Sequence, residues 1–241
     1  LLGADTDFSI AIEKNPVFTN AYTYRAITRS RLGNYDDALK DFHEAIELRP
    51  DLPGPYYSRG VTRLLNQQFE EAIKDLDMFI RHEKKVSDAY LNRGMCYLYL
   101  KDTTKAYEEF ETAIRTNRED PNGYNRRGVL YMQQKRFKEA EVDFDTAIKH
   151  DSSYLLSFFN RALVYSDTNR PMLALSDFDR VIELDSTNSL TYFNRAIVRS
   201  QIGDYNRALD DYNHVAKYSP KNVLVYYNRA MLLSQIGEVE S

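Results

Sequence analysis

The sequence has little of what crosslinking, metal binding or catalysis requires. Cysteine occurs once, at Cys96, and tryptophan is absent. One thiol cannot form an intrachain disulfide or a thiolate metal site, and it is compatible with a reducing cytoplasm without establishing a localisation. The four histidines lack metal-ligand spacing, and no GxSxG, HExxH or glycine-rich phosphate loop occurs. We therefore expect no enzyme activity, no metal and no cofactor.

Long apolar runs and a surplus of basic residues are also missing. No segment approaches the roughly 18 consecutive apolar residues that cross a bilayer, and the first residues hold no basic segment leading into an apolar one. Lysine and arginine number 32 against 36 acidic residues, which gives a formal net charge of −4 without a basic block or stripe. Phosphate binding needs such a stripe. The sequence thus predicts neither a membrane span nor a nucleic-acid partner.

Against these absences stands a strict internal repeat of 34 residues, a signature of repeat architectures. Four kinds of position recur without an insertion. The first position holds alanine: Ala4, Ala38, Ala72, Ala106, Ala140, Ala174 and Ala208. The second holds aromatic residues: Tyr22, Tyr56, Tyr90, Tyr124, Phe158, Tyr192 and Tyr226. The third holds large apolar residues: Phe8, Phe42, Leu76, Phe110, Phe144, Phe178 and Tyr212. The fourth holds small residues: Ala26, Gly60, Gly94, Gly128, Ala162, Ala196 and Ala230.

Within one repeat the spacings are helical. Tyr22 and Ala26 lie four residues apart, and so do Ala38 and Phe42, which predicts two amphipathic helices. A glycine breaks the pattern between them, and Pro50 stands where the second helix should stop. Small residues allow the two axes to approach closely, while the aromatic positions fill the space between hairpins. Each repeat is therefore a helical hairpin that needs its neighbours to complete a core.

These positions resemble the tetratricopeptide repeat over essentially the whole chain. The resemblance implies an all-α fold, a right-handed α-solenoid or superhelix of antiparallel helix-turn-helix units. We expect a single solenoid over residues 1–241, with the second helix of a partial repeat at 1–16 and the first helix of another at 223–241. Six full repeats lie between them, at 19–52, 53–86, 87–120, 121–154, 155–188 and 189–222.

Both ends of the chain fall inside a repeat in this register. Solenoids need polar capping elements, whereas these ends present apolar helix faces. We therefore expect end-to-end self-association through uncapped terminal repeats. A targeting signal can lie upstream of a chain that starts in this way.

An arginine stands just before the small residue of every first helix, where the family ordinarily has leucine. Arg25 lies eight residues before Gly33 and Asp41 eight after it, so both sit at one height on antiparallel helices that rise about 1.5 Å per residue. The same spacing pairs Arg25 with Asp41, Arg59 with Asp75, Arg93 with Glu109, Arg127 with Asp143, Arg161 with Asp177 and Arg195 with Asp211. We expect a structural ladder of partly buried ion pairs. Alternatively, the guanidinium groups point into the groove toward an anionic ligand.

Directly before these arginines stand four asparagines: Asn92, Asn160, Asn194 and Asn228. In the family this position faces the concave groove. The arrangement resembles the asparagine ladder in the repeat arm of O-GlcNAc transferase, whose amides hold the backbone of an extended peptide. An amide both donates and accepts, so it matches a peptide unit of any sequence. Alternatively, asparagine merely tolerates a solvated position, although it is a mediocre helix former.

Apolar residues lie directly before the asparagine position. As candidate peptide contacts we select Tyr57, Leu91, Phe159, Phe193 and Tyr227. Aromatic side chains there can anchor the side chains of a bound peptide. Packing between neighbouring first helices would explain such residues too, the aliphatic ones above all.

The sequence therefore predicts a protein-protein interaction scaffold that binds an extended peptide or partner segment in its concave groove. Two alternatives stay open, a substrate-recruiting arm of a larger enzyme and a purely structural spacer in an assembly. Fold and groove chemistry of this kind serve many unrelated complexes, so the sequence names no partner.

Overall fold

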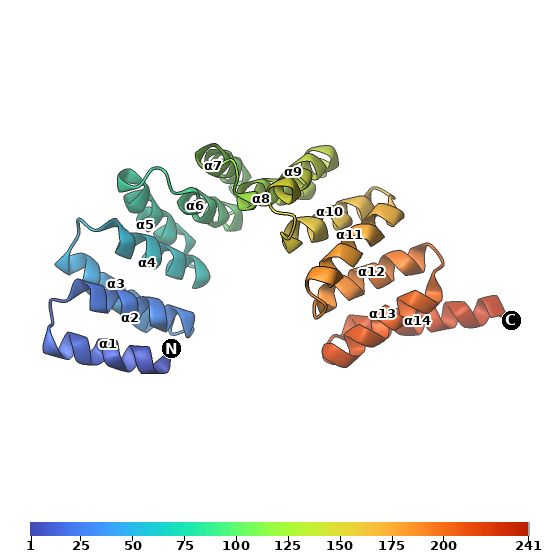
Figure 1. Cartoon of the computed structure of the whole chain (residues 1–241), viewed down its shortest axis with the longest axis horizontal. Helices are drawn as coiled ribbons and strands as arrows, with labels where there is room; N and C mark the ends of the chain where they lie inside the picture. Colours follow the sequence, from blue (N-terminus) through green and yellow to red (C-terminus); the bar gives the residue numbers. More distant parts are fainter. Residues whose placement is uncertain (241) are drawn as a thin grey trace. The chain divides into compact units, whose positions relative to one another are not determined.

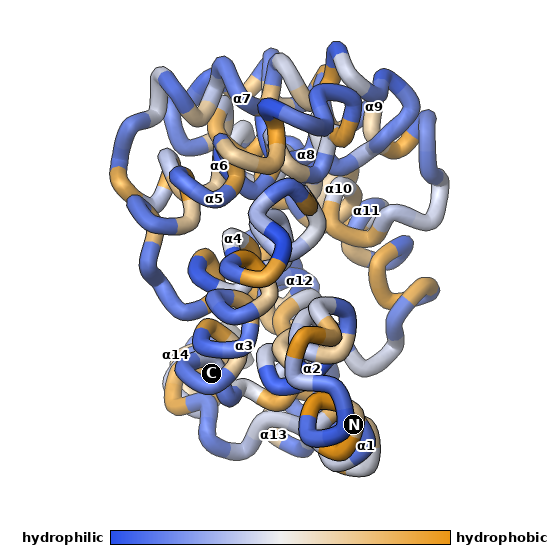
Figure 2. The backbone as a smooth tube through the Cα atoms, turned by 90° about the vertical axis from the view of Figure 1, so that its left-hand side faces the viewer, coloured by the Kyte–Doolittle hydropathy of each residue, from blue (hydrophilic) through white to orange (hydrophobic). Residues whose placement is uncertain are grey.

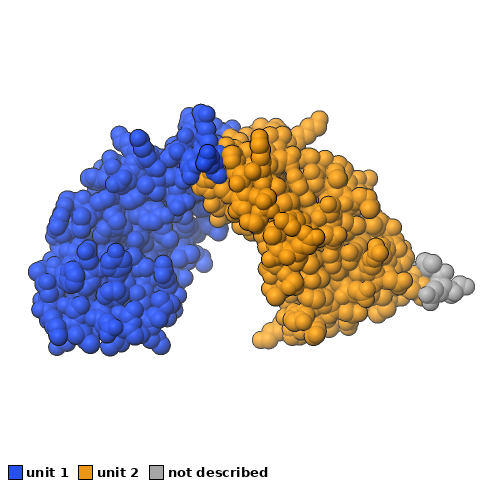
Figure 3. All heavy atoms as spheres, viewed as in Figure 1, with its two compact units in different colours: residues 1–119 blue, residues 120–241 orange. Residues whose placement is uncertain are grey.

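A computed structural model describes the backbone of residues 1–240 and the side chains up to residue 237. Within these residues the chain forms fourteen α-helices and no strand (Figure 1). It divides into two compact units, residues 1–119 and 120–241 (Figure 3). The predicted all-α class of antiparallel helical hairpins is confirmed. That both units belong to one solenoid over residues 1–241 stays a prediction.

Unit 1 contains the first seven helices. They are α1 (Leu2–Lys14), α2 (Thr19–Arg31), α3 (Tyr35–Leu48), α4 (Pro53–Leu65), α5 (Phe69–His82), α6 (Ser87–Tyr99) and α7 (Thr103–Thr116). Hairpins are formed by α2 with α3, α4 with α5, and α6 with α7, and α3 and α5 each pack on the hairpin that follows. We call α2, α4 and α6 first helices and their partners second helices.

Unit 2 repeats this arrangement. Its helices are α8 (Pro121–Gln133), α9 (Phe137–His150), α10 (Leu155–Asp167), α11 (Pro171–Leu184), α12 (Ser189–Gln201), α13 (Tyr205–Tyr218) and α14 (Val223–Glu240). The even-numbered helices are the first helices, and α14 packs against α13. Along the helices the backbone alternates between hydrophilic and hydrophobic residues, as amphipathic packing requires (Figure 2).

Local sequence sets the helix ends. Proline occupies the first turn of α4, α8 and α11, where its missing N–H costs nothing. Every hairpin turn contains one residue in the left-handed region, with φ between 57° and 82°. Glycine fills this place only at Gly33 and Gly203, while Gln67, Lys101, Lys135 and Asn169 adopt the same conformation. In the first hairpin the N–H of Asn34 donates a 2.9 Å hydrogen bond to the carbonyl of Arg29, which caps the C-terminal end of the helix.

The small residues of the first helices face the large apolar residues of the second helices. A methyl group built on Gly94 would lie 2.6 Å from Phe110, and one on Gly128 would lie 2.7 Å from Phe144. Both phenylalanines are fully buried. The two helix axes can approach this closely only because no side chain intervenes. This contact forms the core of each hairpin.

The structure bears on three features that often carry function: a reactive thiol, a membrane-spanning helix and a cluster of metal ligands. The thiol of Cys96 is buried, and burial raises its pKa to about 12, which leaves it unreactive. Within the described residues, no helix is both long and apolar enough to cross a bilayer. The same residues contain no group of three or more His, Cys, Asp or Glu side chains placed to hold a metal ion.

Candidate functional site

Each arginine of the predicted ladder lies against the acidic residue of its own hairpin. In the first hairpin, Arg25 Nε donates to Asp41 Oδ2 over 2.8 Å and Nη2 to Oδ1 over 2.7 Å. Equivalent paired bonds of 2.6–3.0 Å join Arg59 to Asp75, Arg127 to Asp143, Arg161 to Asp177 and Arg195 to Asp211. Arg93 Nη2 contacts both carboxylate oxygens of Glu109, at 2.8 and 2.9 Å. The guanidinium groups are therefore held by carboxylates.

These ion pairs lie largely out of solvent. The five arginines that pair with aspartate have side chains 12–18% exposed, and their aspartates are 3–7% exposed. Burial raises the pKa of Asp177 although Arg161 opposes the shift, and burial likewise raises the pKa of Glu109 beside Arg93. Desolvation thus outweighs attraction at these two carboxylates. Such pairs specify how two helices pack more than they add to stability.

A second set of bonds joins three of the hairpins to the hairpin before them, and helical spacing within one repeat does not predict it. Arg93 Nη1 donates to Asp77 Oδ1 over 2.6 Å, and Arg195 Nη1 donates to Asp179 Oδ1 over 2.6 Å. Arg161 bonds to Asp145 in the same way. These three aspartates sit two residues after the ladder acids, at multiples of 34. This recurrence of aspartate at one repeat position is the sequence feature that could have indicated these bonds.

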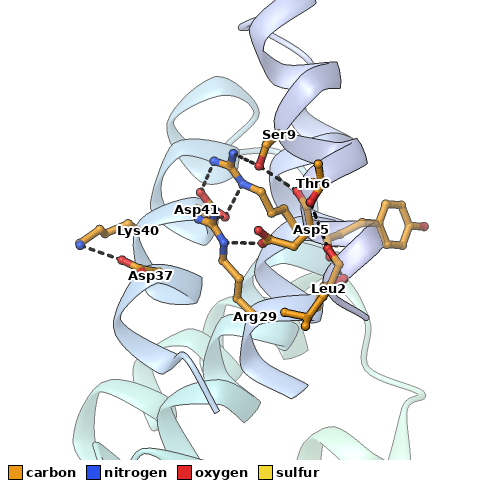
Figure 4. Close-up of polar contacts among 11 residues, drawn as sticks. Leu2, Asp5, Thr6, Ser9, Arg29, Asp37, Lys40 and Asp41 are labelled. Atoms are coloured by element: carbon orange, nitrogen blue, oxygen red, sulfur yellow. Dashed lines mark hydrogen bonds and ion pairs between the residues drawn. The ribbon is translucent and has the colours of Figure 1, made fainter. Parts of the chain in front are cut away.

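Three hairpins place a second arginine on the same carboxylate. Figure 4 shows Arg29 between two acids, and its Nη1 lies 2.9 Å from Asp41 Oδ2 while its Nε lies 2.7 Å from Asp5 Oδ1. Arg63 and Arg199 contact Asp75 and Asp211 equivalently. In the other hairpins this position holds tyrosine, and the ring of Tyr165 lies 5.6 Å from Arg161 Cζ. The ladder is therefore a network of paired charges with aromatic faces against it.

The predicted asparagines are half-buried, and each uses its side chain in a hydrogen bond. Asn92 Nδ2 donates to the Tyr57 hydroxyl over 3.2 Å, and Asn194 Nδ2 donates to the Leu190 carbonyl of its own helix over 2.8 Å. Asn160 Nδ2 donates to Asn125 Oδ1 over 3.0 Å, across two first helices. Asn228 bonds to the hydroxyl of Tyr212. At Asn92, Asn160 and Asn228 the amide thus joins neighbouring elements, whereas Asn194 bonds within its own helix, and all four remain partly open to solvent.

The candidate aromatic contacts pack partly against the second helix of their own hairpin. Ring centroids lie 4.9 Å apart for Tyr57 and Phe79, 5.8 Å for Phe159 and Phe178, and 6.0 Å for Phe193 and Tyr212. Tyr227 is 62% exposed. The first three rings are therefore held on one side by the second helix, whereas Tyr227 is largely exposed.

Leu91 does not fit the predicted role. Only 7% of its surface is exposed, so it has almost nothing to offer a bound segment. Its neighbours Ala89 and Tyr90 are buried as well, which places this part of α6 inside the core of unit 1. The helical spacing placed Leu91 on the same helix face as the other candidates but could not show that neighbouring elements cover it.

Recesses lie between successive first helices in both units. In unit 1 a recess of about 330 Å³ between α2 and α4 is lined by Tyr24, Ile27 and Ser58, among others. In unit 2 a recess of about 320 Å³ between α12 and α14 is lined by Ile197, Asn228 and other residues. Tyr24, Ser58 and Asn228 occupy the same position of the repeat, directly before the arginine. The position singled out by its asparagines therefore lines a hollow in each unit.

The most voluminous of the described recesses, about 700 Å³, has a different character. It lies beside α11 and the turn between α12 and α13, and it includes Met172, Arg180 and Arg207. Its charged side chains are engaged with one another, as in the 2.9 Å contact between Arg180 and Glu183. None of the four predicted asparagines lines it.

Models of the tetratricopeptide repeat match residues 19–52, 87–120, 121–154 and 178–210, which together exceed half of the chain. The chain belongs to the tetratricopeptide repeat family. No curated protein matches it in sequence. The family models describe a helical repeat, and none describes a catalytic domain.

Solved structures of tetratricopeptide proteins share the fold. A chain of the APC/C hetero-tetramer Cut9-Hcn1 superposes with a TM-score of 0.80 at 14% identity over 94% of this chain, which spans only 45% of that one. A tetratricopeptide repeat protein from Parabacteroides merdae gives 0.74 at 16% identity, over 96% of this chain and 92% of that one. YrrB, described as a TPR protein with an unusual peptide-binding site, gives 0.56 at 21% identity over 76% and 95%.

Proposed function

We propose that this tetratricopeptide repeat chain is a protein-interaction scaffold that binds an extended segment of a partner protein along its first helices. The observation that carries the proposal is the pair of recesses between successive first helices, one in each unit. Both are lined from the position directly before the arginine, which Asn160, Asn194 and Asn228 occupy on three successive first helices of unit 2. A segment laid across these helices meets one such side chain in every repeat.

The asparagines supply contacts to a peptide backbone. Asn194 engages its Nδ2 with its own helix, and no bond to its Oδ1 occurs in the part of the chain that the structure describes, so this oxygen can accept a peptide N–H. One hydrogen bond contributes roughly 0.5–1.5 kcal/mol net. Three amides alone therefore give weak binding that tolerates many sequences. Side-chain anchors have to add the rest.

The aromatic residues next to the asparagines can provide these anchors. Phe159 and Phe193 are half-buried, and each is held by a ring of the second helix, so little conformational entropy is lost when a ligand packs on them. Tyr227 adds a largely exposed ring on α14. The ladder arginines have no part in this proposal, because carboxylates already neutralise them. Descriptions of related structures as peptide-binding and as subunits of an assembly favour the same function.

Affinity capture tests the proposal. The chain is used as bait in native lysate beside a variant with Asn160, Asn194 and Asn228 changed to alanine. A second variant, with the exposed Asn15, Asn117 and Asn206 changed to alanine, serves as the matched control. We expect the first variant to lose a protein that the wild type and the control both retain, while circular dichroism shows all three folded. Identical captured proteins for all three baits would refute the proposed site.

A further inference from the structure

One long face of α1 is open, and it carries the residues that other second helices bury beneath their first helix. In α3 two of these positions hold Ala38 and Phe42, which are fully buried. Their equivalents on α1, Ala4 and Phe8, are partly exposed, and no residue of α1 is buried. A recess of about 390 Å³ lies here between α1 and α2, and Phe8 lines it.

This recess has the walls between which a first helix packs elsewhere in the fold. In unit 2, Ala162 of α10 shares a core cluster with Phe178 of α11 and Val198 of α12, so a first helix contacts its own second helix and the next first helix. The recess beside α1 is likewise bounded by a second helix and the next first helix. Asp7 is charged, and the other lining residues are neutral. A first helix with a small residue and one cation would therefore fill it.

The helix α14 has the opposite open face, the one that a second helix covers in the complete hairpins. Ala230 is exposed there, whereas Ala196 at the same repeat position of α12 is fully buried. Leu233 is 52% exposed, whereas Tyr165 at the same repeat position of α10 is 8% exposed. Exposed apolar residues at positions that are otherwise covered indicate an interaction surface.

The two open faces carry the two halves of one ladder pair. Asp7 stands at the repeat position of the ladder acids, is exposed, and has no bonded partner in the described part of the chain. Arg229 Nη1 donates to Asn213 Oδ1 over 3.0 Å, as Arg195 Nη1 donates to Asp179. Arg195 also uses Nε and Nη2 for its ladder acid, but these two groups of Arg229 have no bonded partner among the described residues. Arg229 is thus oriented for a carboxylate that its own unit does not supply.

We propose that α14 of one copy docks on α1 of a second copy and completes a tetratricopeptide hairpin between the two chains, with Arg229 paired to Asp7. The second copy is the occupant because it supplies the acid and the large apolar residue at the matching repeat positions. Ala230 then faces Phe8, as Gly94 faces Phe110 within one chain. The contact is heterologous, so assembly continues into a ring or an open filament. The inference is independent of the proposed function, because binding of a partner segment is no part of it.

Two variants that each block one face test the arrangement. Asp7→Arg places a like charge opposite Arg229, and Ala230→Arg puts a long side chain where a small residue must face Phe8. Both positions are exposed, so both variants should fold, which circular dichroism checks. In sedimentation velocity the wild type should grow in mass with concentration, and each variant alone should associate at least about tenfold more weakly.

Mixing the two variants should restore one interface and no more. The Asp7→Arg chain keeps an intact α14, and the Ala230→Arg chain keeps an intact α1, so an equimolar mixture should form a dimer and stop there. The matched controls are Glu13→Arg on α1 and Gln235→Arg on α14. They change the charge by the same amounts at repeat positions that stay exposed in the complete hairpins. Both controls should associate like the wild type.

Engineered cysteines report the register of the two helices. A Cβ built on Gly94 lies 3.0 Å from Glu109 Cβ, so cysteines at the equivalent positions 230 and 7 of two copies should lie within reach of a disulfide. The native cysteine is buried and does not compete. Mild oxidation of mixed Asp7→Cys and Ala230→Cys chains should give a linked dimer. Glu13→Cys mixed with Ala230→Cys should give far less of it.

Four results would overturn the inference. They are a wild type that stays monomeric at its highest soluble concentration, blocked variants that associate like the wild type, a mixture that forms no dimer, and equal crosslinking through positions 7 and 13. The last would mean that the chains associate in another register. None of these results bears on the proposed function, which the capture experiment decides by itself.

Discussion

Removing Arg161 is expected to destabilise unit 2 far more than removing an exposed arginine. Arg161 donates two hydrogen bonds of 2.7 Å to Asp177 and another to Asp145 of the preceding hairpin, and its side chain is 17% exposed. The substitution Arg161→Met keeps most of the apolar stem but leaves the carboxylate of Asp177 buried at 5% exposure without its cation. Breaking a buried pair in this way costs about 3–5 kcal/mol.

The cost should depend on the remaining carboxylate, so a second substitution should recover most of it. In the variant with both Arg161→Met and Asp177→Leu, no charge is stranded, and the free energy of unfolding should return to within about 1 kcal/mol of the wild type. The matched control is Arg180→Met on α11, because Arg180 is 42% exposed and contacts the exposed Glu183. We expect that change to cost less than about 1 kcal/mol.

The defect should also fade in acid. Arg161 is the group that lowers the pKa of Asp177, whose net shift is already upward because of burial. Without Arg161 this folded-state pKa rises further above that of the unfolded chain. The folded variant then binds the extra proton more readily, so its penalty is largest at neutral pH and shrinks as the pH falls toward about 3.9.

Urea unfolding followed by circular dichroism measures these differences, with hydrogen exchange in α10 and α11 as a local readout, because repeat proteins need not unfold in one step. Equal losses for Arg161→Met and Arg180→Met would refute the argument. So would a double variant as unstable as the single one. Either result would mean that the carboxylate of Asp177 is not stranded in a buried site.

Three further predictions follow from packing, titration and surface exposure. Gly94→Ala should cost about 1–3 kcal/mol in urea unfolding because its methyl group would lie 2.6 Å from Phe110, whereas Gly54→Ala, with open space around it, should be neutral or gain up to about 1 kcal/mol. Burial lowers the pKa of His214, whose Nδ1 has no hydrogen-bond partner, so the unfolded chain takes up the proton first and stability should fall as the pH drops below about 6.5. His214→Phe should flatten this pH dependence. Urea midpoints measured at several pH values test this, and an unchanged dependence of the midpoint on pH in the variant would contradict it. At high concentration the chain should self-associate through the exposed apolar side chains of α1 and α14, and a strict monomer in sedimentation would count against that.

Much of the fold could be predicted because its positions repeat at one interval. Gly94 belongs to the repeat position that holds small residues and Phe110 to the position that holds large apolar residues, and the structure places the two in contact. Equal distances from the turn brought Arg25 and Asp41 to one height, which needs only the rise of a helix. Contacts within a hairpin follow from such arithmetic.

Contacts between hairpins did not follow so readily. Asp77 occupies a repeat position that also holds aspartate in other repeats. Its bond to Arg93 nevertheless depends on how one hairpin packs against the next, and the repeat period does not specify that packing. Leu91 shows the same limit, since the sequence spacing does not reveal that neighbouring elements bury its side chain.

Site-specific photo-crosslinking shows most clearly whether a partner lies on the first helices. A photoreactive side chain is introduced at Leu190 of α12 in one variant and at Leu173 of α11 in another, two positions with 58% and 48% exposure. We expect the captured partner to become attached through position 190 and not through position 173. Attachment through position 173, or equally through both, would contradict it.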